Sequence, residues 1–335
     1  MPGAQGRADP EFGAPAIELT GDPLIPAVRR TANRPDAFAL GLGAKTPIFG
    51  PSMKPAKLHV AAAQMKFRPT IRENVERIIE LIHSSARGGA DVILFPECAV
   101  TGYRREFKGL ETGSVHRACA EVARAARETR CNVLAGSPTF RNGKWFNSLL
   151  VFNRRGRSVF QYSKIHLTTE DARFFTPGNS PAFFHLDGIP CTAIICHERR
   201  YPELVRLPAM LGAQVVFHPN AGLDRLEVSK TKRRGRDGIA VRAFENQIYY
   251  VFANSVGPQG NGLWSAGDSK IVAPDSRVLA LANNRDEMVI QAELDLTKAG
   301  RKYAREAQDQ PVFLRNAWRQ MLVACKRQLL RQKVR

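Results

Sequence analysis

Three side chains that could do covalent chemistry occur where buried strands of this chain are expected to end. Glu97 follows the apolar run DVILF, Lys164 closes the segment GRSVFQYSK, and Cys196 closes CTAIIC. In α/β proteins, the carboxyl ends of strands are the usual place for an active site. A cysteine thiol becomes a strong nucleophile when a neighbouring base takes its proton. The pattern therefore predicts Cys196 as a nucleophile and Glu97 as its general base.

Lys164 has a role in the same chemistry. Attack of sulfur on an amide carbon builds a negatively charged oxygen, which needs fixed hydrogen-bond donors. The Lys164 ammonium and the backbone N–H of His197, directly after the nucleophile, could supply them, and the cation would also favour the thiolate. Glu97 could then activate the water that releases the acyl group. Each residue alone also has a structural interpretation, since a cysteine at a strand end is commonly a packing residue.

Alternating strands and helices must position these side chains. Thr70 and Glu73 form a capping box at the start of a helix that ends before Gly88 and Gly89. Most of the expected strands lack in-and-out polarity, so the sheets should be covered on both faces. This alternation predicts an α/β layered protein. The expected strands are 58–65, 91–97, 131–138, 145–152, 156–164, 191–196, 214–220 and 248–254, with helices at 114–129, 202–211 and 238–246, and closing β-hairpins at 269–274, 276–282 and 288–294.

The two ends of the chain differ from the region between them. Residues 1–56 hold nine prolines and little periodicity, so they are expected to be an irregular extension, and Met1–Phe12 resembles vector-derived sequence. Residues 57–295 are expected to form the catalytic domain. The basic tail 296–335 is expected to be helical and to pack on a partner subunit, because it supplies an apolar surface. That surface consists of Val312, Phe313, Trp318, Met321, Leu322, Leu329 and Leu330.

The composition excludes several classes of protein. The chain has 335 residues, 44% hydrophobic and 24% charged, which is typical of a globular protein with a substantial core. No apolar run reaches the ~18–20 residues of a transmembrane helix, and no signal peptide is evident. The six cysteines form no CxxC pair, which favours reduced thiols and a cytoplasmic location. The seven histidines show no metal-ligand spacing, so neither a metal nor another cofactor is expected.

The net charge of +19 would suit nucleic-acid binding. However, Lys and Arg are spread along most of the chain, with local excesses only at Lys230–Arg236 and in the tail. No zinc-finger, RNP-type or helix-turn-helix signature is present. The sequence therefore favours a small-molecule partner over nucleic acid.

Three segments carry a resemblance to a known family. FPECAVTGY (95–103), YSKIHL (162–167) and IICHERRYPE (194–203) resemble the three signature segments of the nitrilase, or carbon–nitrogen hydrolase, superfamily. The resemblance covers roughly residues 57–295. It implies a Glu-Lys-Cys triad at Glu97, Lys164 and Cys196, and a four-layer α-β-β-α sandwich that pairs into a homodimer or a higher homo-oligomer. Further matching segments are AAAQM, Phe146-Asn147-Ser148, FFTPG (174–178), HPNA (218–221), RAFENQIYYVFAN (242–254) and GDSKIVAP (267–274).

One position departs from the family pattern. Members usually carry a second glutamate seven residues before the glycine of the F-x-P-G segment. In this chain that position is Asp171, and Glu170 lies one step earlier. Either carboxylate is therefore a candidate for the second acidic residue.

The residues after the nucleophile suggest a substrate class. Arg199 and Arg200 lie in CHERRYPE, which is similar to the Cys-x-Asp-Arg-Arg-Trp-Pro-Glu segment of N-carbamoyl-D-amino-acid amidohydrolases. There the paired arginines hold the substrate carboxylate, and guanidinium groups suit that task. We expect only one of them, Arg200, to face the pocket. The alternative is that Arg199 forms an ion pair with Glu198 or Glu203.

Three other residues are candidates for the pocket or for the chemistry. His166 lies two residues after Lys164, so it should point to the same face, and Asn220 is a candidate substrate contact within HPNA. His197 is adjacent to Cys196, and neighbouring side chains of a strand point to opposite faces, which argues against a Cys–His dyad.

The predicted activity is hydrolysis of an amide or N-carbamoyl amino acid through a thioester. The alternatives are a nitrilase, which would use the same triad, and a non-catalytic interaction scaffold. Residue His197 does not match the C-W-E segment that typical nitrilases resemble, and an intact triad argues against a scaffold.

Overall fold

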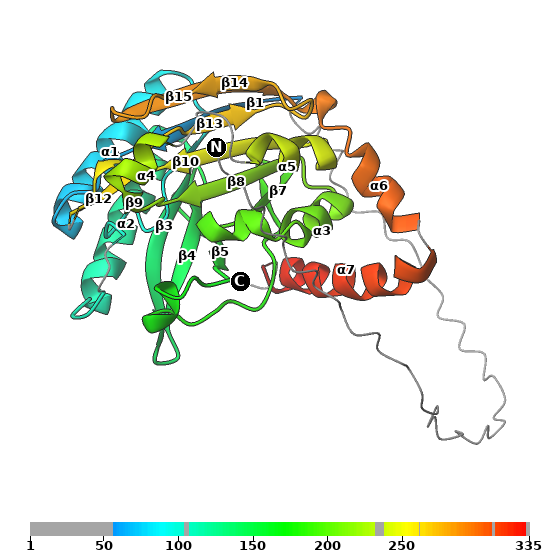
Figure 1. Ribbon diagram of the computed structural model, residues 1–335, viewed down its shortest axis with the longest axis horizontal. Helices are drawn as coiled ribbons and strands as arrows, with labels where there is room; N and C mark the ends of the chain where they lie inside the picture. The colour runs from blue at the N-terminus through cyan, green and yellow to red at the C-terminus, as the bar shows by residue number, and fades with distance from the viewer. Residues whose placement is uncertain (1–55, 104–106, 232–237, 261, 310–311, 333–335) are drawn as a thin grey trace, which may run out of the picture. The chain divides into compact units, whose positions relative to one another are not determined.

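The apolar runs form the strands of two six-stranded sheets in the computed structural model (Figure 1). The structure describes residues 56–103, 107–231, 238–260, 262–309 and 312–332. Except for Ala56, the expected extension 1–56 lies outside these residues, as does most of the basic run Lys230–Arg236. Within the described part of the chain, no helix has the length and apolar character needed to cross a membrane.

The first sheet has the strand order β15-β1-β2-β3-β4-β5. Its first three strands along the chain, β1, β2 and β3, are parallel to one another, and β4, β5 and β15 are antiparallel to their neighbours. The bounds are β1 Lys57–Gln64, β2 Val92–Leu94, β3 Asn132–Arg141, β4 Lys144–Phe152, β5 Ser158–Ser163 and β15 Met288–Asp295.

The second sheet has the order β14-β13-β10-β8-β7-β6, with β7, β8 and β10 parallel. The expected hairpin of β13 and β14 is present, but β15 leaves it and pairs with β1 of the first sheet. The hairpin expectation for 288–294 is therefore wrong, because β1 offers β15 a full eight-residue register. The bounds are β6 Phe184–Leu186, β7 Ile189–Ala193, β8 Val215–Asn220, β10 Tyr249–Asn254, β13 Lys270–Val272 and β14 Val278–Leu281.

Helices cover the outer face of each sheet. α1 (Ile71–Arg87) begins at the expected capping box of Thr70 and Glu73, and it packs with α2 (Thr112–Thr129) on the first sheet. α3 (Glu203–Leu211) and α5 (Ile239–Asn246) pack on the second sheet.

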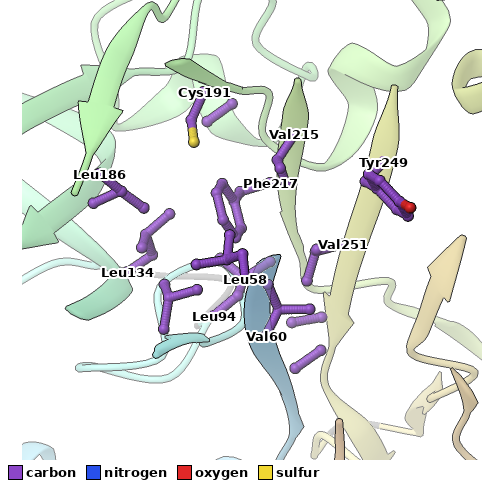
Figure 2. Packing of buried hydrophobic residues seen from close by; sticks show 14 of the residues in the cluster. Leu58, Val60, Leu94, Leu134, Leu186, Cys191, Val215, Phe217, Tyr249 and Val251 are labelled. Carbon is purple, nitrogen blue, oxygen red and sulfur yellow. The ribbon is translucent and has the colours of Figure 1, made fainter. Parts of the chain in front are cut away.

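The inner faces of the two sheets pack against each other. Leu58, Val60 and Leu94 of the first sheet meet Phe217 and Val251 of the second in one buried cluster (Figure 2). The layers therefore run helix, sheet, sheet, helix. This architecture confirms the predicted four-layer α-β-β-α sandwich.

The tail contains two helices, α6 (Lys302–Asp309) and α7 (Val312–Gln332), which pack on α3 of the same chain. Trp318, Leu322 and Cys325 join the apolar cluster beneath α3 and α5, whereas Val312 and Phe313 are exposed. Part of the apolar surface that the sequence predicts to contact a partner subunit thus packs against α3 and α5 of the same chain.

Short elements complete the description. They are the 3-10 helices η1 (Asp171–Arg173), η2 (Cys196–Arg200) and η3 (Leu296–Lys298), the helix α4 (Leu226–Thr231), and a small sheet of β9 (Asp224–Arg225), β11 (Val256–Pro258) and β12 (Leu263–Ala266).

Candidate active site

Glu97 lies in the turn that follows β2, and its side chain is fully buried. Gly136 of β3 makes this turn possible, because a Cβ there would lie 2.3 Å from the carbonyl oxygen of Pro96. The Glu97 Oε1 accepts hydrogen bonds from Lys164 Nζ at 2.8 Å and from Asn147 Nδ2 at 2.7 Å. Its Oε2 accepts one from the backbone N–H of Ala221 at 3.1 Å, which reaches across from the second sheet.

Lys164 lies between two buried carboxylates. Its Nζ is 2.8 Å from Glu97 Oε1 and 2.7 Å from Asp171 Oδ2, and all three side chains are inaccessible to solvent. Burial alone would lower the pKa of Lys164, but the two carboxylates outweigh it and raise the pKa well above its ordinary value. Burial also raises the pKa of Glu97, although Lys164 partly opposes this. The lysine is therefore a permanent cation, and Glu97 is the more basic of the two carboxylates.

The structure separates the two candidates for the second carboxylate. Asp171 begins η1, and its Oδ2 accepts hydrogen bonds from Lys164 Nζ and from the backbone N–H of Thr168 at 3.1 Å. Its Oδ1 accepts a hydrogen bond from the Tyr103 hydroxyl at 2.5 Å. Glu170 is exposed and forms an ion pair with Arg173 at 3.0 Å. Asp171, and not Glu170, therefore contacts the lysine.

Cys196 lies on a strained turn and not on a strand. β7 ends at Ala193, and η2 begins at Cys196 with φ +52°, a left-handed conformation that a non-glycine residue adopts at a cost. The thiol lies near Glu97 and Lys164, whose charges act on it in opposite directions. Burial raises the pKa of the thiol to about 12, with Glu97 adding to this and Lys164 opposing it. Lys164 thus favours the thiolate, but burial and Glu97 outweigh it, so the resting thiol is neutral.

A buried histidine supports the carbonyl side of this turn. The Cys196 carbonyl oxygen can only accept, so His218 Nε2, 3.0 Å away, carries the proton. His218 Nδ1 then accepts from the Tyr250 hydroxyl at 2.9 Å. Burial lowers the pKa of His218 to about 3, so the ring is neutral. His218 appeared in the sequence only as part of a matching segment, because nothing local connects it to Cys196.

A cavity of about 650 Å³ opens above this cluster. Its walls include Cys196, Lys164, Tyr103 and His197. The sequence predicts that His197 points to the face opposite Cys196, as neighbouring residues of a strand do. This prediction is wrong, because Cys196 lies on a turn, where side chains do not alternate in that way. His166 does not line the cavity as expected; its ring stacks on Tyr201 at 3.5 Å.

Both arginines line the same cavity, and not Arg200 alone. Arg199 is half-buried and Arg200 is exposed. Neither forms an ion pair with a carboxylate of the described residues, so the alternative that Arg199 pairs with Glu198 or Glu203 is not observed. Both also line a second cavity of about 480 Å³ beside α5.

Asn220, at the end of β8, lines the cavity as well. Asn254 Nδ2 donates to the carbonyl of Gly267, so Asn254 Oδ1 must accept the bond from Asn220 Nδ2 at 2.8 Å. This chain of bonds leaves Asn220 Oδ1 buried without a donor among the described residues. In that part of the chain, no group of three or more His, Cys, Asp or Glu side chains could hold a metal ion.

Comparisons with known proteins agree with this geometry. A family model described as carbon–nitrogen hydrolase matches residues 59–303. A nitrilase of Pyrococcus abyssi is 31% identical over 247 residues, which cover 71% of this chain and 90% of that protein. A 2-oxoglutaramate amidase of Bacillus subtilis is 28% identical, over 68% of this chain and 86% of the relative.

The fold also matches a solved structure. An amidase from Nesterenkonia sp. superposes with a TM-score of 0.68 at 24% identity, covering 78% of this chain and 96% of the other. Another structure of that amidase shows covalent addition of an acetamide moiety at its active-site cysteine. Since the family model and the Pyrococcus relative each span more than two thirds of the chain, the protein belongs to the carbon–nitrogen hydrolase family.

Proposed function

We propose that this protein hydrolyses the primary amide or carbamoyl group of a small substrate that also carries a carboxylate, with Cys196 as nucleophile. One observation carries the proposal. The floor of a single cavity holds Cys196 and Lys164, with Glu97 and Asp171 bonded to the lysine behind it, and the cavity wall holds two arginines that are not paired with a described carboxylate. N-carbamoyl amino acids and ω-amides of dicarboxylic acids both fit this description.

The first half of the reaction forms a thioester. Glu97 takes the proton of the Cys196 thiol as sulfur attacks the carbonyl carbon, because the resting thiol is neutral and the Glu97 carboxylate lies near it. Lys164 and the backbone N–H of His197 are the proposed donors to the resulting oxyanion. Glu97 then delivers the proton to the amide nitrogen, the C–N bond breaks, and ammonia leaves.

The second half releases the acid. A water molecule gives its proton to Glu97 and attacks the thioester carbon through the same oxyanion geometry. The C–S bond breaks, the sulfur recovers the proton from Glu97, and the carboxylic acid departs. Asp171 keeps Lys164 in place through both halves, since it balances the lysine charge while Glu97 carries the proton.

The arginines support an anionic substrate. A guanidinium group pairs well with a carboxylate, and here neither Arg199 nor Arg200 is neutralised by a described acidic side chain. One relative is named for 2-oxoglutaramate, an amide that bears a carboxylate.

Asn220 favours an amide over a nitrile. Its Oδ1 has no donor among the described residues and belongs to a side chain of the cavity wall. The nitrogen of a primary amide or carbamoyl group has N–H groups to offer to such an acceptor, whereas a nitrile nitrogen has none. The relative named nitrilase keeps nitriles among the substrates to be tested.

Ammonia release over a matched panel tests the proposal. The panel should contain N-carbamoyl amino acids, ω-amides of dicarboxylic acids, neutral amides of the same length, and the corresponding nitriles. We expect turnover of the acidic amides or carbamoyl compounds to exceed that of the neutral amides, and the nitriles to be slowest. Faster turnover of nitriles would overturn the amide assignment, and equal turnover of acidic and neutral amides would overturn the carboxylate assignment.

A further inference from the structure

Glu198, two residues after Cys196, is a buried carboxylate that the proposed chemistry does not use. Its side chain has no exposed surface, and it faces away from the cavity that Arg199 and Arg200 line. A buried carboxylate without donors is costly, so its contacts indicate why the fold keeps it there. Burial raises the pKa of Glu198 to about 7, although its hydrogen bonds oppose this.

Four groups donate hydrogen bonds to this one side chain. Oε2 accepts from the backbone N–H of Ile195 at 2.7 Å, and Oε1 accepts from the backbone N–H groups of Ile165 at 2.6 Å and His166 at 3.2 Å. The Tyr162 hydroxyl contacts both oxygens at 2.8 and 2.9 Å. Such charge-assisted bonds are short and directional.

The donors come from the two chain segments that carry Lys164 and Cys196. Ile195 directly precedes Cys196, which follows a strand of the second sheet, and Ile165 directly follows Lys164, which follows β5 of the first sheet. The two reacting side chains therefore belong to different sheets. Glu198 is therefore bonded to both chain segments: Oε1 accepts the backbone donors beside Lys164, Oε2 accepts the one beside Cys196, and Tyr162 of β5 contacts both oxygens.

We propose that Glu198 is a positioning residue that sets the separation between the Lys164 ammonium and the Cys196 sulfur. It also restrains the strained turn from the amide side of Cys196, opposite to the His218 contact. This inference rests on the proposed roles of Lys164 and Cys196. It adds that Glu198 holds the Lys164 segment of one sheet and the Cys196 segment of the other at the separation that the reaction needs.

The test uses Glu198→Gln, which keeps the shape but replaces one acceptor oxygen with a donor that faces Ile195 or Ile165. Two rates are measured in the full chain: turnover of an acidic and a neutral amide, and alkylation of Cys196 by iodoacetamide followed by mass spectrometry. We expect both rates to fall about 100-fold, the usual effect of a displacement near 1 Å in an active site. The loss should be equal for acidic and neutral amides, because the arginines are not the cause.

A matched pair of tyrosine variants separates positioning from stability. Tyr162→Phe removes one donor to Glu198, whereas Tyr249→Phe removes the hydroxyl of another buried tyrosine, which donates to the carbonyl of Asp295 at 2.8 Å, also between the two sheets. Both should lower the melting temperature. Only Tyr162→Phe should slow alkylation and turnover, by about 3- to 10-fold, the effect of losing one hydrogen bond of typical strength while three other donors still hold Glu198.

Two outcomes would overturn the inference. One is a folded Glu198→Gln protein whose alkylation and turnover stay within threefold of the wild type. The other, which decides the matter if Glu198→Gln does not fold, is an unchanged alkylation rate in Tyr162→Phe. Because alkylation needs no substrate turnover, a failure of the proposed function would show separately, as absent ammonia release from the wild-type protein.

Discussion

Two regions of the cavity differ in whether their charges are already paired. The floor contains Lys164 with its carboxylate partners, and the arginine wall contains Arg199 and Arg200. On the floor, Lys164 and its two carboxylates are fully buried and compensate one another before any substrate arrives. On the wall, Arg199 and Arg200 are at least partly exposed and form no ion pair with the described carboxylates. The floor can thus act on many different amides, whereas the two arginines of the wall can be paired only by a negatively charged substrate.

This difference has a physical reason. A buried charge must be paired at all times, because desolvation without a partner costs several kcal/mol. A partly exposed guanidinium can stay hydrated until a carboxylate replaces its water. Changes to the floor should therefore affect every substrate, and changes to the wall should affect acidic substrates alone.

The largest effect is expected at the nucleophile. Cys196→Ala should lower kcat at least about 10³-fold for acidic and neutral amides alike, because no thioester can form. Mass spectrometry of the wild-type protein with substrate should show an acyl adduct on Cys196. Circular dichroism should confirm that the variant is folded. Retained turnover, or an adduct on Cys98, would remove Cys196 from the mechanism.

The second carboxylate should have the next largest effect. Asp171→Asn removes one of the two carboxylates that hold Lys164, which typically costs roughly 3–5 kcal/mol of stability. A displaced lysine should also lower kcat by about 100-fold, since a misplacement near 1 Å can have that effect. Glu170→Gln is the matched control, because that side chain is exposed and contacts Arg173. We expect its kcat/KM to stay within twofold of the wild type. Comparable losses in the two variants would contradict the distinction that the structure draws.

The arginine wall should give a smaller and selective effect. Arg200→Gln and Arg199→Gln each remove a charge-assisted bond worth roughly 1.5–3 kcal/mol, which is about 10- to 150-fold in kcat/KM. The loss should appear for acidic amides and be absent for neutral amides of the same length. A loss of equal size for both substrates would make the arginine a structural residue and reduce the protein to a general amidase.

The smallest expected effect is on the pH dependence of kcat/KM, which should reflect the floor and not the arginine wall. Glu97 must be ionised to accept the thiol proton, and burial raises its pKa, so kcat/KM should fall as the pH falls through a limb above the ordinary glutamate range. The limb should be the same for acidic and neutral amides, since an arginine stays charged up to a pH of about 12. Initial rates across the pH range would measure this. A limb confined to acidic substrates would place the titrating group on the wall.

The local sequence was enough to predict the reacting residues at the floor of the cavity. Glu97, Lys164 and Cys196 could be predicted because each follows an apolar strand pattern, and strand ends meet at one edge of a sheet. The capping box of α1 and the hairpin of β13 and β14 were predictable for the same reason, since both depend on residues close together in the chain.

Tertiary structure decided the contacts that cross the sandwich. β15 pairs with β1 and not within a hairpin, because the register between them joins residues more than 200 positions apart. The end of β7 at Ala193 put Cys196 on a turn, which brought His197 to the cavity, and the stacking of His166 on Tyr201 kept that ring out of it. Glu198 is a possible ion-pair partner for an arginine by sequence alone, yet three of its four donors come from residues 162–166, which lie 32 to 36 positions away in the chain. Local sequence patterns predict where the strands end. Only the packing of the two sheets determines which buried polar groups meet at those ends.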